Sequence, residues 1–447
     1  MAANRAIAQT PDRPNVVCIF IDDLRPDGFA SLGNPVVKTP NFDALVSRGC
    51  RFRRAYTMGS MVGAVCLPSR TMMLTGRSLF HATGDASGDD PATHTFPRVM
   101  KDAGYTTMHA GKFGNSPKPI TSEFDETTDP GWAGAVADDV IDFIGRTASK
   151  SPMFIYMAGR EPHDPQYAAD EFYAQYPPEE VPLPARFAPY QPFDNGAMTI
   201  RDEMTLPFPR TPEEVKGKLA RYYASIAYLD AEVGRVVQAL KDAGQYDNTL
   251  FVIAGDNGLS LGDHGLLGKQ NLYEFGGMHV PLVFAGPGIP EGDTDALAYL
   301  MDIFPTVCDL TNVPNPANVE GKSLAPVIDD RDSGVRDWLY TAYQEGQRAV
   351  TDGRWKLIRY PLIDKTQLFD LQNDPLEQND LASNPDHAQR IQTMMDKLAE
   401  LQRQYDDPVP LTVPDPKPAA WSPEQLTPEQ IEYQIAETAR CRDAKPM

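Results

Sequence analysis

The chain alternates between two patterns of hydrophobic and polar positions. Short, almost continuous apolar runs rich in β-branched residues are typical of parallel strands that are buried on both faces. Five such runs occur, at residues 15–22, 105–110, 153–158, 249–254 and 280–285. Segments with helical periodicity lie between them. This alternation predicts an α/β fold built on a large, mostly parallel sheet, whose ligands lie beyond the carboxyl ends of the strands.

The clearest predicted helix spans residues 212–243. Its apolar residues recur at alternating intervals of four and three, which marks one buried stripe, and Gly244 follows as the stop. A shorter helix is predicted after Thr39, which can serve as the N-cap, with Pro40 at the first helical position.

The pattern changes near residue 330, where short strands replace the alternation. Strands are predicted at 338–344, 347–351 and 355–360, and a polar helix near 387–405. We therefore expect two domains, 1–330 with the large sheet and 331–447 with a small antiparallel sheet, a helix and a Pro-rich tail. The tail has few apolar anchors, so it is predicted to wrap the surface.

Composition excludes some classes of function. The chain has 447 residues, of which 41 % are hydrophobic, which is ample for a folded core, and no apolar run is long enough to span a membrane. The net charge of −21 argues against a nucleic-acid-binding surface, which must be basic. An anionic substrate would therefore need a local basic pocket. Ala6-Ile7-Ala8 resembles the end of a signal peptide, which favours a periplasmic or secreted protein, with a cytoplasmic start as the alternative.

Oxygen-donating side chains stand where two of the predicted strands end. Asp22 and Asp23 close the first run, and Asp256 and Asn257 follow the fourth. Three carboxylates and one amide carbonyl, without Cys or His, suit a hard cation such as Ca²⁺ rather than zinc. Either motif alone is common as a turn or a helix cap. The prediction of a metal site therefore depends on both motifs occurring together with a third motif, at Cys66, which is described next.

Cys66 opens the run Cys66-Leu67-Pro68-Ser69-Arg70, which is followed by Leu74-Thr75-Gly76-Arg77. The cysteines as a group show neither metal-ligand spacing nor a disulfide framework. Pro68 suits the first turn of a helix, so we expect Cys66 close to a helix N-terminus, where backbone N–H groups stabilise negative charge. In this run the chain resembles the type I sulfatases, in which the cysteine of a Cys-x-Pro-Ser-Arg sequence is oxidised to formylglycine.

The resemblance runs from about residue 13 to 380 and implies an alkaline-phosphatase-like sandwich fold. It also implies a Ca²⁺ ion, bound by the formylglycine oxygen of residue 66 together with the side chains of Asp22, Asp23, Asp256 and Asn257. Formylglycine hydrates to a gem-diol, which attacks sulfur through one hydroxyl and expels sulfate with the help of the other. Arg70, one helical turn from Cys66, is expected to hold the diol. Maturation would require a formylglycine-generating enzyme.

Three further residues match positions that contact the substrate in the family. Lys112, at the end of the run 105–110, and Lys269, in the stretch that begins at Asp256, are expected to bind the sulfate. His163 lies in Glu161-Pro162-His163-Asp164-Pro165, just after the run 153–158. Its family counterpart reaches the bridging oxygen, so His163 is expected to bind substrate and to protonate the leaving alcohol.

One position departs from the family pattern. Many relatives carry a histidine two residues after the early lysine, but Gly114 stands there in this chain and cannot transfer a proton. His109 is a poor substitute because, in a strand, it points to the face opposite Lys112. We therefore expect Asn115 or His264 to orient the diol.

The resemblance is strongest to iduronate-sulfatase-like members, which predicts a sulfatase that hydrolyses a sulfate monoester of a mono- or oligosaccharide. The Pro-rich segment 177–210 either shapes a substrate wall or is a structural excursion. Two alternatives stay open for the function. The same apparatus serves hydrolases of phosphonate monoesters and phosphodiesters, and the loss of the histidine at Gly114 would suit a catalytically silent binder of sulfated glycans.

Overall fold

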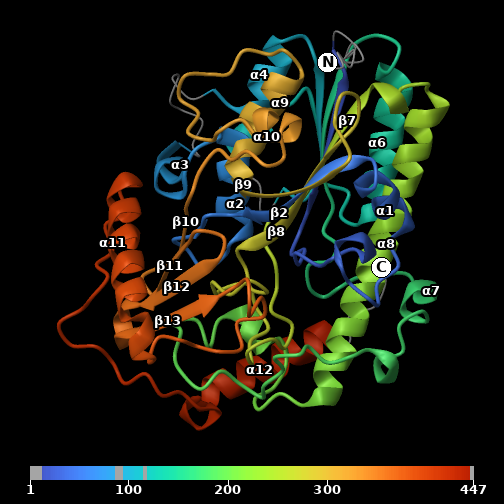
Figure 1. Ribbon diagram of the computed structural model, residues 1–447. Coiled ribbons are helices and arrows are strands. Elements are labelled where there is room, and N and C mark those ends of the chain that lie inside the picture. The colour runs from blue at the N-terminus through green and yellow to red at the C-terminus, as the bar shows by residue number, and fades with distance from the viewer. Residues whose placement is uncertain (1–12, 86–93, 114–117, 443–447) are drawn as a thin grey trace.

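The structure, a computed structural model, describes residues 13–85, 94–113 and 118–442. Within these ranges, eight strands form the central sheet: β1 (Asn15–Ile21), β2 (Gly49–Tyr56), β4 (Thr106–Gly111), β5 (Glu126–Thr128), β6 (Met153–Ala158), β7 (Thr249–Gly255), β8 (His279–Ala285) and β9 (Gly292–Tyr299). Their order is β5-β4-β6-β1-β7-β8-β2-β9 (Figure 1). The first five are parallel, and β8 alone is antiparallel to both of its neighbours.

Helices cover both faces of this sheet because its strands are apolar on both sides. Val17 and Ile19 of β1 pack toward α1 (Pro40–Val46), α6 (Ala133–Thr147) and α8 (Pro212–Asp242). Val16 and Cys18 face the opposite layer, with α2 (Cys66–Thr75), α4 (Phe96–Asp102), α9 (Ile303–Leu310) and α10 (Ala325–Asp329). Shorter helices are α3 (Leu79–Asp85), α5 (Lys118–Thr121) and α7 (Asp170–Tyr173).

The predicted α/β architecture is confirmed, and the five apolar runs form β1, β4, β6, β7 and β8. The long helix is α8, which starts with a capping box at Thr211 and is followed by Gly244 in the left-handed conformation (φ 68°). The sequence analysis missed β2 and β9. Both lie at one edge of the sheet and carry charged residues, so neither shows a continuous apolar run.

A smaller sheet has the order β13-β12-β11-β10-β3. It consists of β3 (Gly59–Ser60), β10 (Leu339–Tyr343), β11 (Gln347–Thr351), β12 (Trp355–Tyr360) and β13 (Lys365–Asp370), and α11 (Ala388–Gln404) packs on it. The predicted antiparallel sheet and polar helix are therefore present. β3 pairs parallel with β10 and joins the segment just before Cys66 to this sheet, while the domain boundary at residue 330 stays a prediction.

The tail contains an element that the sequence analysis did not predict. After an irregular segment that contains the 3₁₀ helix η8 (Pro423–Gln425), the chain forms α12 (Pro428–Arg442), which runs along the lower side of the molecule in Figure 1. Its apolar residues are mostly exposed, so the sequence lacks the buried stripe that usually indicates a helix. Within the described ranges, none of the helices has the length and apolar character needed to cross a bilayer.

Candidate active site

The carboxyl ends of four neighbouring parallel strands carry most of the predicted site residues. Ile21 of β1 is in register with Gly255 of β7, so Asp22 and Asp256 follow side by side, and the Asp256 N–H donates to the Ile21 carbonyl (2.9 Å). Lys112 follows β4 in the same way, where its N–H donates to the carbonyl of Ala158 at the end of β6 (2.8 Å). His163 lies five residues beyond that point. Residues far apart in sequence therefore meet at one edge of the sheet.

Asp23 and Asp256 form the centre of a buried acidic cluster. Asp23 has a left-handed backbone conformation (φ 64°), which is unfavourable for most residues other than glycine. Its N–H donates to Asp256 Oδ1 (3.0 Å), and Asn257 Nδ2 donates to its carboxylate (2.6 Å). The side chains of Asp22, Asp23, Asp256 and Asn257 are at most 1 % exposed. Backbone strain held by such contacts is typical of functional sites.

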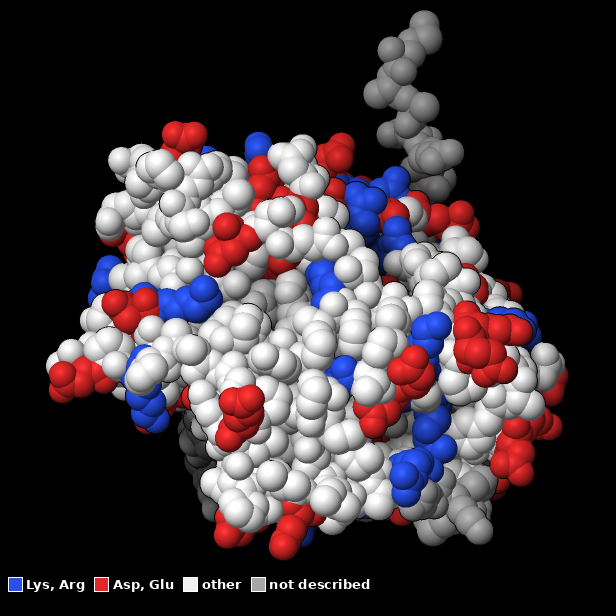
Figure 2. Space-filling view, turned by 90° about the horizontal axis from the view of Figure 1, so that it is seen from below, with Lys and Arg blue, Asp and Glu red and all other residues white. Residues whose placement is uncertain are grey.

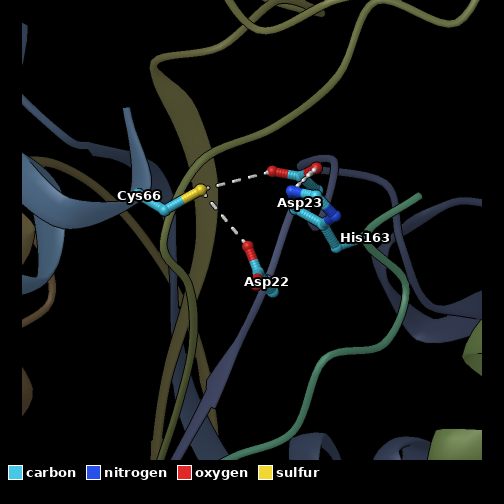
Figure 3. A group of neighbouring side chains, drawn as sticks. All are labelled: Asp22, Asp23, Cys66 and His163. Carbon is cyan, nitrogen blue, oxygen red and sulfur yellow. Dashed lines mark hydrogen bonds and ion pairs between the residues drawn. The ribbon is translucent and has the colours of Figure 1, made fainter. Parts of the chain in front are cut away.

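Cys66 is the first residue of α2, as predicted, and its side chain points into this cluster (Figure 3). The thiol Sγ lies 3.3 Å from Asp22 Oδ1 and 3.8 Å from Asp23 Oδ1. Burial and the neighbouring Asp22 raise the pKa of the Cys66 thiol well above its ordinary value, although Lys269 opposes this. The unmodified thiol is therefore neutral near pH 7 and a poor nucleophile.

Three cations surround the acidic cluster. The Arg70 Nε donates to Asp256 Oδ2 (2.9 Å), and Lys112 forms an ion pair with Asp22. Lys269 donates to both Asp23 Oδ1 (2.5 Å) and the Cys66 Sγ (3.0 Å). Lys269 is only 2 % exposed, so its charge is not screened by water and acts strongly on an anion at residue 66.

His163 approaches the cluster from the side opposite α2 (Figure 3). Its Nδ1 lies 2.8 Å from the carbonyl oxygen of Asp164, which can only accept, so Nδ1 carries the proton. Its Nε2 lies 3.8 Å from Asp23 Oδ2. Because the backbone contact fixes the tautomer, Nε2 is the nitrogen that can exchange a proton with a bound substrate.

Two observations test whether the cluster fits a metal ion. No donor among the described residues hydrogen-bonds Asn257 Oδ1, although this carbonyl oxygen is fully buried. Burial and the nearby Asp22 raise the pKa of Asp256 to about 6, which reflects carboxylates crowded together. A hard divalent cation would satisfy the amide oxygen and offset this repulsion. The four oxygen-donor residues therefore fit such an ion.

A cavity of about 360 Å³ opens above Cys66. It is lined by the predicted residues Cys66, Lys112, His163 and Lys269, and also by Gly63, Ala64, Ile200, Arg201, Asp202 and Gln270. The sequence analysis missed Arg201 and Asp202, because they lie in a short 3₁₀ helix with no strand end to mark them. It did consider a substrate wall as one of two roles for the segment 177–210. Because Arg201 and Asp202 line the cavity, the structure favours that role over a purely structural excursion.

The two candidates for orienting the diol differ in what the structure says of them. Asn115 and Gly114 lie outside the described residues. The His264 ring stacks on Tyr273 (centroids 4.0 Å apart), and its charged neighbours are Arg186 and Lys356 rather than the cations around Cys66. His264 therefore packs on Tyr273, whose hydroxyl donates to Gln367 of β13, and these surroundings do not favour the role that we expected for it.

His109 is buried among aromatic rings, which agrees with its dismissal as a proton donor. Its ring lies 5.2 Å from Phe113 and 5.1 Å from Tyr156, and burial lowers its pKa to about 3. In the unfolded chain the His109 imidazole binds a proton near pH 6.5. The stability that the neutral ring confers on the fold is therefore complete above that pH. It is lost as the pH falls toward 3.

We therefore expect His109→Phe to reduce the acid sensitivity of the fold. At pH 5 the wild-type protein should have lost about 2 kcal/mol of unfolding free energy through this residue, and the variant should not. Denaturant unfolding of both proteins at pH 7.5 and pH 5 measures the difference. An equal loss in the two proteins would show that His109 does not titrate in this way.

Comparison with known proteins shows which family the chain belongs to. A family model described as Sulfatase matches residues 14–313, about two thirds of the chain. A second, described as N-sulphoglucosamine sulphohydrolase, C-terminal, matches residues 262–404. The chain is 26 % identical to the N-acetylglucosamine-6-O-sulfatase of Bacteroides thetaiotaomicron, over 88 % of this chain and 87 % of that protein. It is 28 % identical to the iduronate 2-sulfatase of Homo sapiens, over 65 % and 64 % respectively.

Solved structures confirm the predicted sulfatase-type, alkaline-phosphatase-like fold. A protein in complex with its substrate D-glucosamine-2-N,6-O-disulfate superposes with a TM-score of 0.74, at 22 % identity, covering 89 % of this chain and 99 % of that one. The phosphonate monoester hydrolase of Agrobacterium radiobacter superposes with a TM-score of 0.72, at 23 % identity, covering 88 % and 96 %. Because the Sulfatase family model matches most of the chain, this chain belongs to the sulfatase family of sulfuric ester hydrolases.

Proposed function

We propose that this enzyme hydrolyses a sulfate monoester of a carbohydrate, with a formylglycine derived from Cys66 and a bound Ca²⁺ ion. The observation that carries the proposal is the cavity above Cys66, where Lys112, Lys269 and His163 face one buried acidic cluster. This combination offers cations for an anionic group, oxygen ligands for a metal and a proton donor within one pocket.

Each side chain has a distinct task in this reaction. Lys112 and Lys269 bind the sulfate oxygens and stabilise the charge that builds up on them in the transition state. Arg70 holds the side chain of residue 66. Its buried Nη1 and Nη2 make no hydrogen bond to the described residues, and Nη2 lies 3.6 Å from Asp22 Oδ2. His163 donates a proton from Nε2 to the oxygen of the leaving alcohol, while its Nδ1–H keeps the ring oriented against the Asp164 carbonyl.

Two groups that are not encoded amino acids, the Ca²⁺ ion and the formylglycine aldehyde, would act next to these residues. Asp22, Asp23, Asp256 and Asn257 would hold the Ca²⁺, which as a Lewis acid makes an adjacent hydroxyl more acidic. The hydrated aldehyde of formylglycine would supply that hydroxyl as the nucleophile. Its formation depends on a formylglycine-generating enzyme, and the expected export of the protein remains part of the proposal.

The relatives support a carbohydrate as the alcohol part of the substrate. The printed names of two of them are N-acetylglucosamine-6-O-sulfatase and iduronate 2-sulfatase, and one similar structure holds a disulfated glucosamine. A cavity of about 360 Å³ is large enough for a sugar ring, since ligand pockets typically span about 300–1,000 Å³. A panel of sulfated sugars identifies the sugar and the sulfate position.

The experiment compares two kinds of ester on the same protein. We expect release of free sulfate from a panel of sulfated mono- and oligosaccharides, after expression together with a formylglycine-generating enzyme. The matched phosphate monoesters, phosphodiesters and phosphonate monoesters should react at least about 100-fold more slowly. This ratio corresponds to a difference of about 3 kcal/mol in activation free energy. Faster phosphonate hydrolysis would favour the alternative that the Agrobacterium radiobacter structure represents.

The alternative function, a catalytically silent binder of sulfated glycans, predicts a different result. If Cys66 remained a thiol after coexpression with the maturation enzyme, or carried the aldehyde without any turnover, the protein would bind sulfated glycans and not cleave them. Mass spectrometry of the peptide that contains Cys66 separates these cases from the proposed enzyme.

A further inference from the structure

The helix α12 lies outside both segments that the family models match. The segments end at residues 313 and 404, whereas α12 spans Pro428–Arg442. Despite this, α12 packs on η3 (Arg201–Thr205), the short 3₁₀ helix that carries Arg201 and Asp202 into the cavity above Cys66. The end of the chain therefore reaches the rim of the active site.

Polar contacts fix the position of α12 on this rim. Gln434 is 4 % exposed, accepts from the Phe208 N–H (3.3 Å) and donates to the Leu206 carbonyl (3.2 Å). Six residues later, Arg440 forms an ion pair with Asp164, the residue that follows His163. Asp164 also accepts from Arg201 (3.0 Å), so it joins the helix to the cavity wall.

Tyr433 lies on the same stripe of α12 as Arg440, because the two are seven residues apart in a helix. Its side chain is 43 % exposed, and the charged groups that act on its hydroxyl are Glu437, Arg201, Arg440 and Asp202. A large, partly exposed aromatic ring thus lies on the helix that packs against η3, whose Arg201 and Asp202 line the cavity. The underside of the molecule, to which α12 belongs, carries few charges near its centre (Figure 2).

We infer that Tyr433 is a specificity-determining residue that binds the sugar part of the substrate. An aromatic ring beside polar groups suits a pyranose, which presents an apolar C–H face and a rim of hydroxyls. The Tyr433 ring takes the C–H face, and Arg201 and Asp202 hydrogen-bond the hydroxyls. This inference rests on the proposed carbohydrate substrate and deepens it, since it assigns the recognition of the sugar to a helix outside the matched segments.

Binding is tested without turnover, in the Cys66→Ala protein loaded with Ca²⁺. Calorimetry with the sulfated sugars should show a Kd about tenfold higher when Tyr433→Ala is added, which is what the loss of one aromatic contact costs. Tyr433→Phe should keep the Kd within about twofold, because the ring remains. Inorganic sulfate should bind equally well to all of these proteins, since it contacts only the cations at the base of the cavity.

Ile435→Ala is the matched control. Ile435 is also an apolar residue of α12 and is 65 % exposed, but it lies on a different side of the helix from Tyr433 and Arg440. It should leave both affinities unchanged, and thermal unfolding should show that every variant is folded.

The outcomes separate two failures. An unchanged affinity for sugars in Tyr433→Ala, or an equal loss in Ile435→Ala, would overturn the role of Tyr433 while the sulfatase proposal stands. If none of the sulfated sugars bound and the wild-type protein released no sulfate from them, the carbohydrate substrate and the role of Tyr433 would both fall.

Discussion

Replacing Cys66 by alanine should lower the rate of sulfate release by about 10⁴-fold or more, since it removes the side chain that becomes the nucleophile. The fold should persist. Cys66 is the first residue of α2, and the Arg70–Asp256 contact that holds this helix to the carboxylate cluster does not involve the thiol. Initial rates on the best sulfated sugar, measured for the maturated wild type and the variant, give the ratio directly.

A buried cysteine elsewhere provides the control for this substitution. Cys308 of α9 is fully buried in the core beneath the sheet, and burial raises the pKa of its thiol to about 12. Cys308→Ala should leave the rate within about twofold of wild type, because core changes of this size act on stability rather than on chemistry. Residual sulfate release in Cys66→Ala above one hundredth of the wild-type rate would mean that another group attacks the ester.

Removal of divalent cations should abolish turnover and destabilise the fold at the same time. The three aspartates and Asn257 are buried within one cluster, so an ion bound there stabilises the native state over the unfolded chain by mass action. A chelator should lower the midpoint of thermal unfolding by about 5 °C and suppress sulfate release at least about 100-fold. Added Ca²⁺ should restore both, and Zn²⁺ should not, because all four predicted ligands are oxygen donors.

The Asn257 side chain links this effect to the structure. Asn257→Leu removes the buried oxygen and should abolish the rise in unfolding temperature that Ca²⁺ produces, whereas Asn257→Asp keeps an oxygen ligand and should retain part of it. If Ca²⁺ stabilised the Leu variant as much as the wild type, the ion would bind elsewhere on the chain.

Much of the site follows from local sequence. The residues after β1 and β7 could be identified because apolar runs mark the strands and parallel strands end at a common edge. Cys66 at the start of α2 was signalled by Pro68, whose ring fits the first helical turn. Lys269 lies in a loop without such a signal and was found through the resemblance alone.

Long-range packing decided the remainder. His264 stands near Asp256 in sequence, but its left-handed backbone (φ 53°) turns its ring toward Tyr273. No local pattern encodes that turn, because the His264 N–H donates to the carbonyl of Arg186, which is distant in sequence (2.9 Å). Arg201 and Asp202 likewise reach the cavity only through the packing of η3, and strand ends do not predict them.

By itself, the sequence determined the α/β layers, the family and the chemistry at the sheet edge, because hydrophobic periodicity and short motifs act over a few neighbouring residues. Only the tertiary structure decided which side chains close the cavity. The helix α12 has no buried apolar stripe of its own, and its place beside Asp164 and η3 comes from contacts between residues more than 200 positions apart. Such contacts leave no periodic trace in the chain.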